Sequence, residues 1–363
     1  MKILFITRKY PPSTGGMETA AYRLYTALAA QNDVQLVKWG GSNKLLPIVY
    51  PGLLAQALWH GLMRKPDVIY LQDGIMAPLG WIVQGVLRRP TVMTIHGMEV
   101  TYRNALYRHM VTPYIGRATR LVAVSNETTR TVEQKLPGTH PEVIFNGLYD
   151  NFYDPRPRKE HLTIIAHEAG VPLEDLSKRK LLYTNGRLVT RKGVLWFIQH
   201  VMPGLPDNTL YLVSGDGPDR EHMQAAIARL HLEDRVKLLG RVPDEVRQAL
   251  YNAADIFLMP NIPVAGDMEG FGLVALEASS CGCMVLAAKL EGIPDAIIDG
   301  QNGRLLEPQN ASAWAHAVTG ELKARSLSAG AARRFTLRNY SWQRAAAAYE
   351  AVMLEAAEQA EGR

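Results

Sequence analysis

The chain contains 363 residues, of which 47% are hydrophobic and 21% charged, and its formal net charge is +5 at pH 7. This composition is globular, and the length exceeds one ordinary core, so we expect two domains. No run approaches the roughly 18 apolar residues of a membrane-spanning helix, and the N-terminal apolar stretch is too short for a signal peptide. The C-terminus carries no lipidation motif. These features predict a cytoplasmic protein rather than an integral membrane protein.

The positive charge is concentrated in the first part of the chain. Residues 1–150 contain 16 Lys and Arg against 9 Asp and Glu, whereas residues 151–363 contain 24 against 26. A basic surface on the first domain is expected from this difference.

The two cysteines, Cys281 and Cys283, are separated by one residue. They are too close for an ordinary structural disulfide, and no Cys or His nearby completes a metal site. We interpret them as buried small residues, which agrees with an intracellular compartment.

The first half of the chain alternates between apolar runs and segments of helical period. The runs predict strands at residues 2–7, 34–39, 68–72, 91–96, 120–125 and 142–147. Helix-period segments such as 17–31 and 79–89 lie between them. Continuous apolar strands separated by helices are typical of a parallel sheet covered on both faces.

The pattern stops near residues 148–162, where two prolines and charged residues without periodicity predict a linker. It resumes with strands predicted at 180–186, 209–215, 236–240, 256–260, 284–288 and 303–307. The Ala-rich segment 341–360 predicts a long helix that packs back on the first domain. We therefore expect two doubly wound, Rossmann-like α/β domains at 1–155 and 156–340, facing one another across a cleft, and a C-terminal helix at 341–363.

Ligands of such sheets bind outside the carboxyl ends of the strands, so the residues there are the candidates for function. After the first strand, Gly15 and Gly16 lead into a helix whose first turn contains Glu18. A glycine pair at a helix N-terminus suits an anion, although a plain tight turn has the same sequence. His96 and the following glycine end the fourth strand. His96 is either a ligand-contacting residue or a structural histidine.

After the strand at 180–186, Arg187 and Lys192 flank a short loop. Arg provides a planar fork and Lys a point charge, and together they suit a diphosphate. The alternative is a surface basic cluster, and Arg191 between them is expected to be solvated. Gly215 begins an Asp-Gly-Pro turn after the next strand, which is a weak signal.

The stretch "EGFGLVALE" places Glu269 and Glu277 at either end of seven apolar or glycine residues. Gly270 and Gly272 are expected to start a helix whose free N–H groups meet an anion. Each carboxylate can accept hydrogen bonds from vicinal hydroxyls of a sugar. The alternative is a capping Glu269 and a Glu277 paired with a buried arginine.

These candidates together fit a diphosphate with a sugar at each end, which is a nucleotide sugar. A nicotinamide-dependent oxidoreductase is disfavoured, because the loop after the first strand lacks the G-x-G-x-x-G pattern. A non-catalytic nucleotide-sugar-binding protein stays open, because a fold does not define a function.

The ordered set "YPPSTGG", "HG", "NGRLVTRKG", "GDGP" and E-x₇-E resembles the retaining glycosyltransferases of family four, which have the two-Rossmann (GT-B) architecture. The resemblance covers nearly the whole chain. It implies that Arg187 and Lys192 bind the donor diphosphate, Glu277 the ribose, and Glu269 and His96 the hexose. It places Gly16 near the phosphates and Val242 by the base. The donor-binding set is then completed by Gly15, Gly186, Gly215, Gly270, Phe271 and Gly272.

The resemblance implies that a hexose moves from a UDP- or GDP-sugar to an acceptor hydroxyl without a metal or other cofactor. The catalytic residues are then His96, Glu269, Arg187 and Lys192. Weaker candidates on the acceptor side are Glu18, Glu99, Ser125 and Asn126. The chain departs from the usual family pattern at Glu291, where glycine is common, and at Tyr149 and Asp295. Neither nucleic acid nor a metal is an expected ligand.

The basic first domain contains two segments that could lie on an anionic membrane. The segment 45–66 combines apolar residues with Trp59 and carries Arg64-Lys65 near its end. The segment 101–117 interleaves tyrosines (Tyr102, Tyr107 and Tyr114) with arginines (Arg103, Arg108 and Arg117). The alternatives are ordinary helices that cover the sheet with solvated basic residues, and a soluble anionic acceptor.

Overall fold

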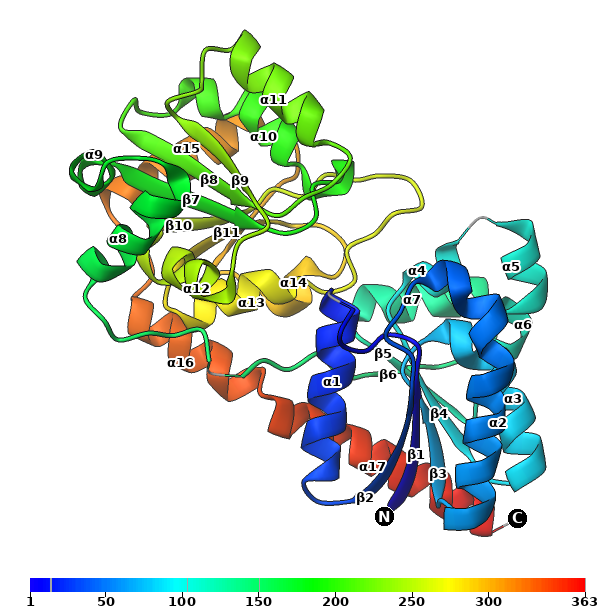
Figure 1. Ribbon diagram of the computed structural model, residues 1–363. Coiled ribbons are helices and arrows are strands. Elements are labelled where there is room, and N and C mark those ends of the chain that lie inside the picture. The colour runs from blue at the N-terminus through cyan, green and yellow to red at the C-terminus, as the bar shows by residue number, and fades with distance from the viewer. Residues whose placement is uncertain (14, 103, 150, 363) are drawn as a thin grey trace. The chain divides into compact units, whose positions relative to one another are not determined.

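The computed structural model describes residues 1–13, 15–102, 104–149 and 151–362 (Figure 1). The chain divides into two compact units. Unit 1 consists of Met1–Gly147 and Tyr340–Arg363, and unit 2 of Leu148–Asn339. The first segment of unit 1 ends at Gly147, before the predicted boundary at 155, and its second segment begins at Tyr340.

Unit 1 contains one parallel sheet with the strand order β2-β1-β3-β4-β5-β6. Its strands are β1 (Lys2–Thr7), β2 (Asp33–Lys38), β3 (Val68–Leu71), β4 (Thr91–Ile95), β5 (Arg120–Ala123) and β6 (Glu142–Val143). Its helices are α1 (Gly16–Ala29), α2 (Leu46–Arg64), α3 (Ala77–Leu87), α4 (Met98–Thr101), α5 (Ala105–Met110), α6 (Thr112–Ile115), α7 (Asn126–Lys135) and α17 (Trp342–Glu361), with short 3₁₀ turns η1 (Asn43–Leu45) and η2 (Gly74–Met76).

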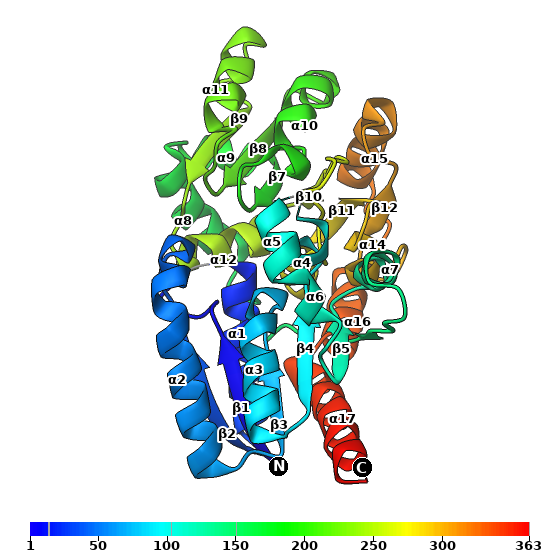
Figure 2. The same cartoon turned by 90° about the vertical axis from the view of Figure 1, so that its right-hand side faces the viewer.

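The central strands of this sheet are buried on both faces, as the continuous apolar runs predict. The helices α2, α3, α5 and α6 lie on one face of the sheet, and α1 and α17 lie on the other (Figures 1 and 2). On the α17 side, Tyr349 packs edge-on against Tyr70, and its hydroxyl accepts a hydrogen bond from Thr94 at 3.1 Å. The C-terminal helix therefore contributes to the core of unit 1.

Unit 2 contains a second parallel sheet, with the strand order β12-β11-β10-β7-β8-β9. Its strands are β7 (Lys180–Asn185), β8 (Thr209–Ser214), β9 (Val236–Gly240), β10 (Ile256–Met259), β11 (Met284–Ala288) and β12 (Arg304–Leu306). Its helices are α8 (Arg158–Ala169), α9 (Leu173–Lys178), α10 (Val194–His200), α11 (Arg220–Arg229), α12 (Asp244–Ala253), α13 (Leu273–Ser280), α14 (Ile293–Ala296), α15 (Ala311–Lys323) and α16 (Ala329–Asn339), with 3₁₀ turns η3 (Thr190–Lys192) and η4 (Met202–Gly204).

The two six-stranded parallel sheets confirm the predicted doubly wound, Rossmann-like fold class. Two local predictions were wrong. The strand expected at 142–147 is limited to Glu142–Val143, because only these residues pair with β5. The linker expected to reach residue 162 ends at Pro157, which precedes the first turn of α8, where proline costs no hydrogen bond.

The two cysteines carry free thiols, as predicted. Cys283 is buried and Cys281 half-buried. Both side chains belong to the packing of unit 2.

Candidate functional site

The carboxyl end of β7 presents a cation to solvent. Arg187 is exposed, and it forms no ion pair with any residue that the structure describes. Lys192 ends the 3₁₀ turn η3 and is largely buried. The two cations predicted to bind a diphosphate therefore differ, since Arg187 is available to an anion and Lys192 already has a partner.

The loops after β7 and β8 approach one another so closely that only glycine fits. A Cβ on Gly215, whose φ is 123°, would lie 1.9 Å from the carbonyl oxygen of Gly186. The N–H of Gly186 in turn donates to the carbonyl of Ser214 at 3.0 Å. Gly215 is required here because another residue would clash and would rarely adopt this φ. The glycines at this edge of the sheet therefore present backbone atoms and no side chains.

Glu269 is the centre of an ion-pair cluster. Its Oε2 accepts hydrogen bonds from Lys192 Nζ at 2.5 Å, from Asn261 Nδ2 at 3.0 Å and from Arg191. Arg191 also donates to Asp267 at 2.9 Å. The prediction that Arg191 is solvated was wrong, because the chain after β10 returns to η3, where the N–H of Ile262 donates to the carbonyl of Arg191 at 2.9 Å.

The cluster fixes the protonation state of Glu269. Burial raises the pKa of this carboxyl, but the charges of Lys192 and Arg191 and the hydrogen bonds from Lys192 and Asn261 outweigh it and lower the pKa to about 2. Glu269 is consequently ionised at neutral pH, accepts hydrogen bonds and is a weak base.

Glu277 lies within α13, in a different environment. Tyr251 donates a hydrogen bond to its Oε2 at 2.7 Å. Asn185, at the end of β7, donates to the Tyr251 hydroxyl at 3.1 Å and accepts from Ser214 at 3.0 Å. This chain of hydrogen bonds ties Glu277 to the carboxyl ends of β7 and β8.

Burial raises the pKa of Glu277, and the hydrogen bond from Tyr251 and the charge of Arg247 offset only part of this effect. The alternative in which Glu277 pairs with a buried arginine is met only in part, because its hydrogen-bond donor is Tyr251 and the half-buried Arg247 acts on it through its charge. Capping by Glu269 is likewise absent, since the N-cap of α13 is Gly272, which has a φ of 104°. The helix starts at Leu273 rather than at Gly270.

Glu291 is a third carboxyl beside this cluster and was not among the predicted site residues. Its Oε2 accepts a hydrogen bond from the backbone N–H of Glu269. Its φ of 52° lies in the left-handed region, which explains why glycine suits this position. The next residue packs on the Glu269–Gly270 backbone, because a Cβ on Gly292 would lie 2.2 Å from the Gly270 carbonyl oxygen. Burial is the main reason that the pKa of Glu291 rises to about 7.

We expect Glu291→Gln to alter the pH dependence of stability. Native Glu291 retains its proton up to about pH 7, whereas the unfolded carboxyl loses it near pH 4.5. The native state therefore binds more protons in this window, and the stability due to Glu291 is lost as the pH rises through it. From pH 5 to pH 8, the free energy of unfolding of the variant should rise relative to that of wild type by about 1 kcal/mol. This figure is smaller than the pKa shift alone implies, because Glu291 is partly exposed and solvent screens its charge.

Chemical denaturation at both pH values measures this gain. Replacement of the exposed Glu233 by Gln is the matched control and should show no such difference. A Glu291→Gln variant that parallels wild type across the window contradicts the assignment.

The other donor-side candidates lie at the same edge of unit 2. Gly270 is half-buried, and Phe271 and Gly272 are buried directly before α13. Val242 follows β9 and is half-buried against the core of unit 2.

In unit 1, His96 lies at the carboxyl end of β4. Its Nε2 is 3.0 Å from the carbonyl oxygen of Gln72, and its backbone N–H donates to Glu99 Oε2 at 3.1 Å. Glu99 is buried, and burial raises its pKa despite the nearby charge of His96. Glu99 therefore holds the chain at His96 through one of its carboxyl oxygens.

A buried ion pair adjoins this group and was missed at the sequence level. Arg8, after β1, donates from Nε to Asp73 Oδ1 at 3.1 Å, and Asp73 also accepts from the N–H of Ile75 at 2.9 Å. Asp73 Oδ2 and Glu99 Oε1 are buried and accept no hydrogen bond within the described part of the chain. The Asp-Gly pair after β3 was the available signal, but it is also an ordinary turn signal.

The remaining candidates of unit 1 have structural partners or lie on the surface. Gly15 and Gly16 are exposed at the start of α1, and Glu18 in its first turn is buried and pairs with Lys9 at 2.8 Å. Ser125 is buried and caps α7 by accepting from the N–H of Thr128 at 3.0 Å. Asn126 is the exposed first residue of α7.

Two family models match the chain in succession. The model of Glycosyltransferase Family 4 matches residues 14–151, and the model of Glycosyl transferases group 1 matches residues 179–323. The chain belongs to the family 4 GT-B glycosyltransferases.

Similar proteins include a GDP-mannose-dependent alpha-(1-6)-phosphatidylinositol monomannoside mannosyltransferase of Mycolicibacterium smegmatis, which is 26% identical over 94% of this chain and 95% of its own length. A D-inositol 3-phosphate glycosyltransferase of Corynebacterium aurimucosum is 27% identical over 80% of this chain and 72% of its own. Among solved structures, Anabaena Alr3699/HepE in complex with UDP has a TM-score of 0.80 at 22% identity, covering 98% of this chain and 100% of that one.

This family membership answers the question of protein class that the sequence left open. The chain is a glycosyltransferase, and neither the oxidoreductase nor the non-catalytic alternative describes it. In this glycosyltransferase, no group of three or more His, Cys, Asp or Glu side chains with the arrangement of a metal site occurs among the described residues.

Proposed function

We propose that this glycosyltransferase moves a hexose from a UDP- or GDP-sugar to an acceptor hydroxyl, with retention of the anomeric configuration and without a metal ion. The observation that carries the proposal is the edge of unit 2 beyond β7, β8 and β10. There the exposed Arg187 lies on the loop that leads to Lys192, and Lys192 is paired with Glu269. Cations and glycine backbone at strand ends suit a diphosphate.

The two carboxyls Glu269 and Glu277 suit the two sugars of such a donor. Glu269 is a hydrogen-bond acceptor beside the cations that is ionised at neutral pH, which fits hydroxyls of the hexose next to the diphosphate. Glu277 is held by Tyr251 within α13, and we assign it to the ribose. His96 of unit 1 would contact the hexose. The carboxyl groups of Glu269 and Glu277 do not identify the nucleotide base. We place Val242 beside this base.

The relatives support a nucleotide-sugar donor without deciding between bases. The M. smegmatis relative is named for GDP-mannose, and the Anabaena protein was solved with UDP and with UDP-glucose. The named acceptor of the former is phosphatidylinositol monomannoside. We therefore consider a glycolipid, a polysaccharide precursor or a small molecule as the acceptor class.

The proposed step is a same-face displacement. The acceptor oxygen forms a bond to the anomeric carbon while the bond from that carbon to the diphosphate oxygen breaks. The bonding electron pair stays on the diphosphate, which also takes the proton of the acceptor hydroxyl. Arg187, Lys192 and the backbone N–H groups before α13 stabilise the negative charge that develops on the leaving group.

The environment of Glu269 argues against a double displacement through this residue. Retaining hydrolases that use two carboxyls place one as a nucleophile and the other as an acid with a raised pKa. The nucleophile in such a scheme must be free to attack, whereas Glu269 Oε2 accepts three hydrogen bonds, two of them from cations. Its charge instead orients the hexose and balances Lys192 and Arg191.

We expect transfer to require only protein, donor and acceptor. A panel of UDP- and GDP-sugars, first ranked by thermal shift, should contain one donor that releases free nucleotide when an acceptor is added. The product should keep the anomeric configuration of the donor by NMR, and EDTA should leave the rate unchanged, because Arg187 and Lys192 supply the positive charge. An inverted product contradicts retention, and loss of activity in EDTA with recovery in Mg²⁺ contradicts the metal-free scheme.

A further inference from the structure

One side of unit 1 is apolar where a helix surface is ordinarily polar. The helices α2 and α3 lie side by side on the sheet, with Gly61 of α2 against Leu87 of α3 (Figure 2). Their solvent-facing side is here named the α2–α3 face. Its exposed large side chains include Ile48, Trp59, Leu62 and Met63 on α2 and Trp81 and Val86 on α3, with exposed fractions between 43% and 75%. The exposed polar residues on these two helices are limited to Gln56 and Arg64.

Much of the remaining described surface does not share this property. On α7, in the same unit, every exposed side chain is polar or charged, from Asn126 to Lys135. In the described part of unit 2, the exposed large hydrophobic residues are Tyr153 and Ile298. In unit 1, a second group of exposed large apolar side chains lies on α4 and α5 and between them, namely Met98, Tyr102, Leu106 and Met110. Exposed apolar surface is therefore concentrated in unit 1, where the α2–α3 face contributes the larger of these two groups.

The two helices of the α2–α3 face carry charges of one sign only. Neither helix contains Asp or Glu. Exposed cations stand at the helix ends, with Lys44 before α2, Lys65 after it and Arg88 after α3. An apolar surface with a basic border is complementary to a surface that is apolar and anionic.

We propose that the α2–α3 face docks on an anionic lipid bilayer. The helix α2 has 19 residues and a length of about 29 Å, and it would lie in the plane of the headgroups with Trp59, Leu62 and Met63 inserted. Tryptophan favours this interfacial depth, and the basic ends would contact anionic headgroups. No described helix is long and apolar enough to cross a membrane, so the contact is peripheral.

The same charges argue against a second copy of this chain as the occupant. A symmetric dimer through the α2–α3 face would bury two copies of the same surface against each other. Lys44, Lys65 and Arg88 would then approach the cations of the other copy, with no carboxylate on either helix to pair with them. Docking on a bilayer does not depend on the proposed reaction.

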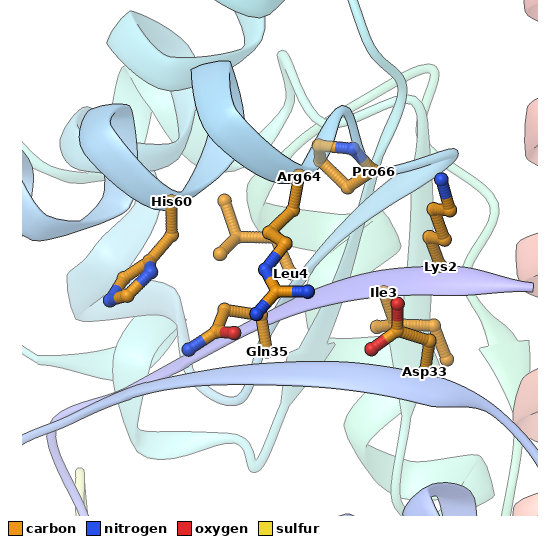
Figure 3. Close-up of a pocket in the computed structure, with 8 residues that line it drawn as sticks. All are labelled: Lys2, Ile3, Leu4, Asp33, Gln35, His60, Arg64 and Pro66. Carbon is orange, nitrogen blue, oxygen red and sulfur yellow. The ribbon is translucent and has the colours of Figure 1, made fainter.

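Not all of the basic residues predicted for this role take part in it. Arg64 and His60 line a pocket at the amino ends of β1 and β2, together with Asp33 and Gln35, so Arg64 turns toward the edge of the sheet (Figure 3). In the segment 101–117, Arg103 lies outside the described residues, and Arg117 lies over the ring of Trp81 at 5.2 Å. Lys65 and Arg88 are therefore the better probes.

Vesicle sedimentation with the full-length protein tests the proposal. At low salt, wild type should bind vesicles with 30% anionic lipid and not zwitterionic vesicles. Trp59→Ser combined with Leu62→Ser and Met63→Ser should weaken binding at least tenfold. Lys65→Gln with Arg88→Gln should weaken it about 25-fold, at about fivefold per cation, and added salt should have a similar effect on wild type.

Matched controls keep these results specific. Leu354→Ser with Ile298→Ser removes exposed apolar side chains elsewhere, and Arg130→Gln with Lys135→Gln removes two cations from α7. Both should bind like wild type. No binding of wild type to anionic vesicles overturns the proposal. A wild-type dimer in sedimentation velocity that the triple variant dissociates overturns it too, in favour of contact between copies. Nucleotide release with a soluble acceptor is measured separately, so failure of docking and failure of the proposed reaction are distinguishable.

Discussion

Lys192→Ala should lower the rate of transfer by about 10² to 10³ while leaving the fold intact, because a donor aimed at the leaving group stabilises the transition state by this order. In the free protein Lys192 is paired with Glu269. After its removal, Glu269 retains the hydrogen bonds from Arg191 and Asn261, so the cluster is not left with an uncompensated buried carboxylate. Arg187→Ala should lower the rate of transfer to a similar extent. Since Arg187 is exposed, the melting temperature of this variant should match that of wild type.

Steady-state rates at saturating donor, with melting temperatures for each variant, check this expectation. Lys178→Ala removes an exposed lysine at the other end of β7 and is the matched control, with an unchanged rate. Rates within threefold of wild type for both Lys192→Ala and Arg187→Ala would falsify the assignment of these cations to the diphosphate.

The strands of both units could be predicted because their signal is local. A parallel strand buried on both faces is a continuous apolar run between helices, and Ile256–Met259 shows this with four buried residues in a row. The positions just after such strands were then the candidates. This reasoning places Arg187, Gly215 and Glu269 at one edge of unit 2 without knowledge of the strand order.

The partners of these residues could not be predicted, because they depend on which strands and loops are neighbours. Arg191 meets Glu269 only because the chain after β10 returns to η3. Arg8 meets Asp73 because β1 and β3 are adjacent, with Ile6 beside Leu71. Tyr251 reaches Glu277 from α12, where a tyrosine on an apolar stripe has the pattern of a core residue.

The cluster around Glu269 also changes how the donor is expected to bind. Without a ligand, Glu269 shares its Oε2 with both Lys192 and Arg191. An arriving diphosphate competes with this carboxylate for Lys192, so part of its attraction to the cations is offset by the loss of existing ion pairs. Under the proposed function, the arrangement would hold the positive charge in position and neutralise it until the donor binds.

Replacement of Glu269 and replacement of Glu277 should therefore have different effects on nucleotide binding and on transfer. Glu277→Ala should weaken binding of UDP or GDP by about 10- to 100-fold, because hydrogen bonds from the ribose hydroxyls to this carboxyl are lost. Glu269→Ala should spare nucleotide binding or tighten it, since Lys192 and Arg191 lose a competing carboxylate. Transfer by this second variant should nevertheless fall by about 10² to 10³, because the hexose is no longer oriented.

Calorimetry with the nucleotide alone, followed by transfer rates on the same samples, measures both effects. Glu269→Gln and Glu277→Gln are the conservative variants, because each keeps an oxygen that can accept from Asn261 or from Tyr251. They show whether a loss comes from the charge or from a disturbed fold. Equal losses of nucleotide affinity in Glu269→Ala and Glu277→Ala would contradict the division of labour, as would a Glu269→Ala enzyme that binds nucleotide and transfers the hexose at the wild-type rate.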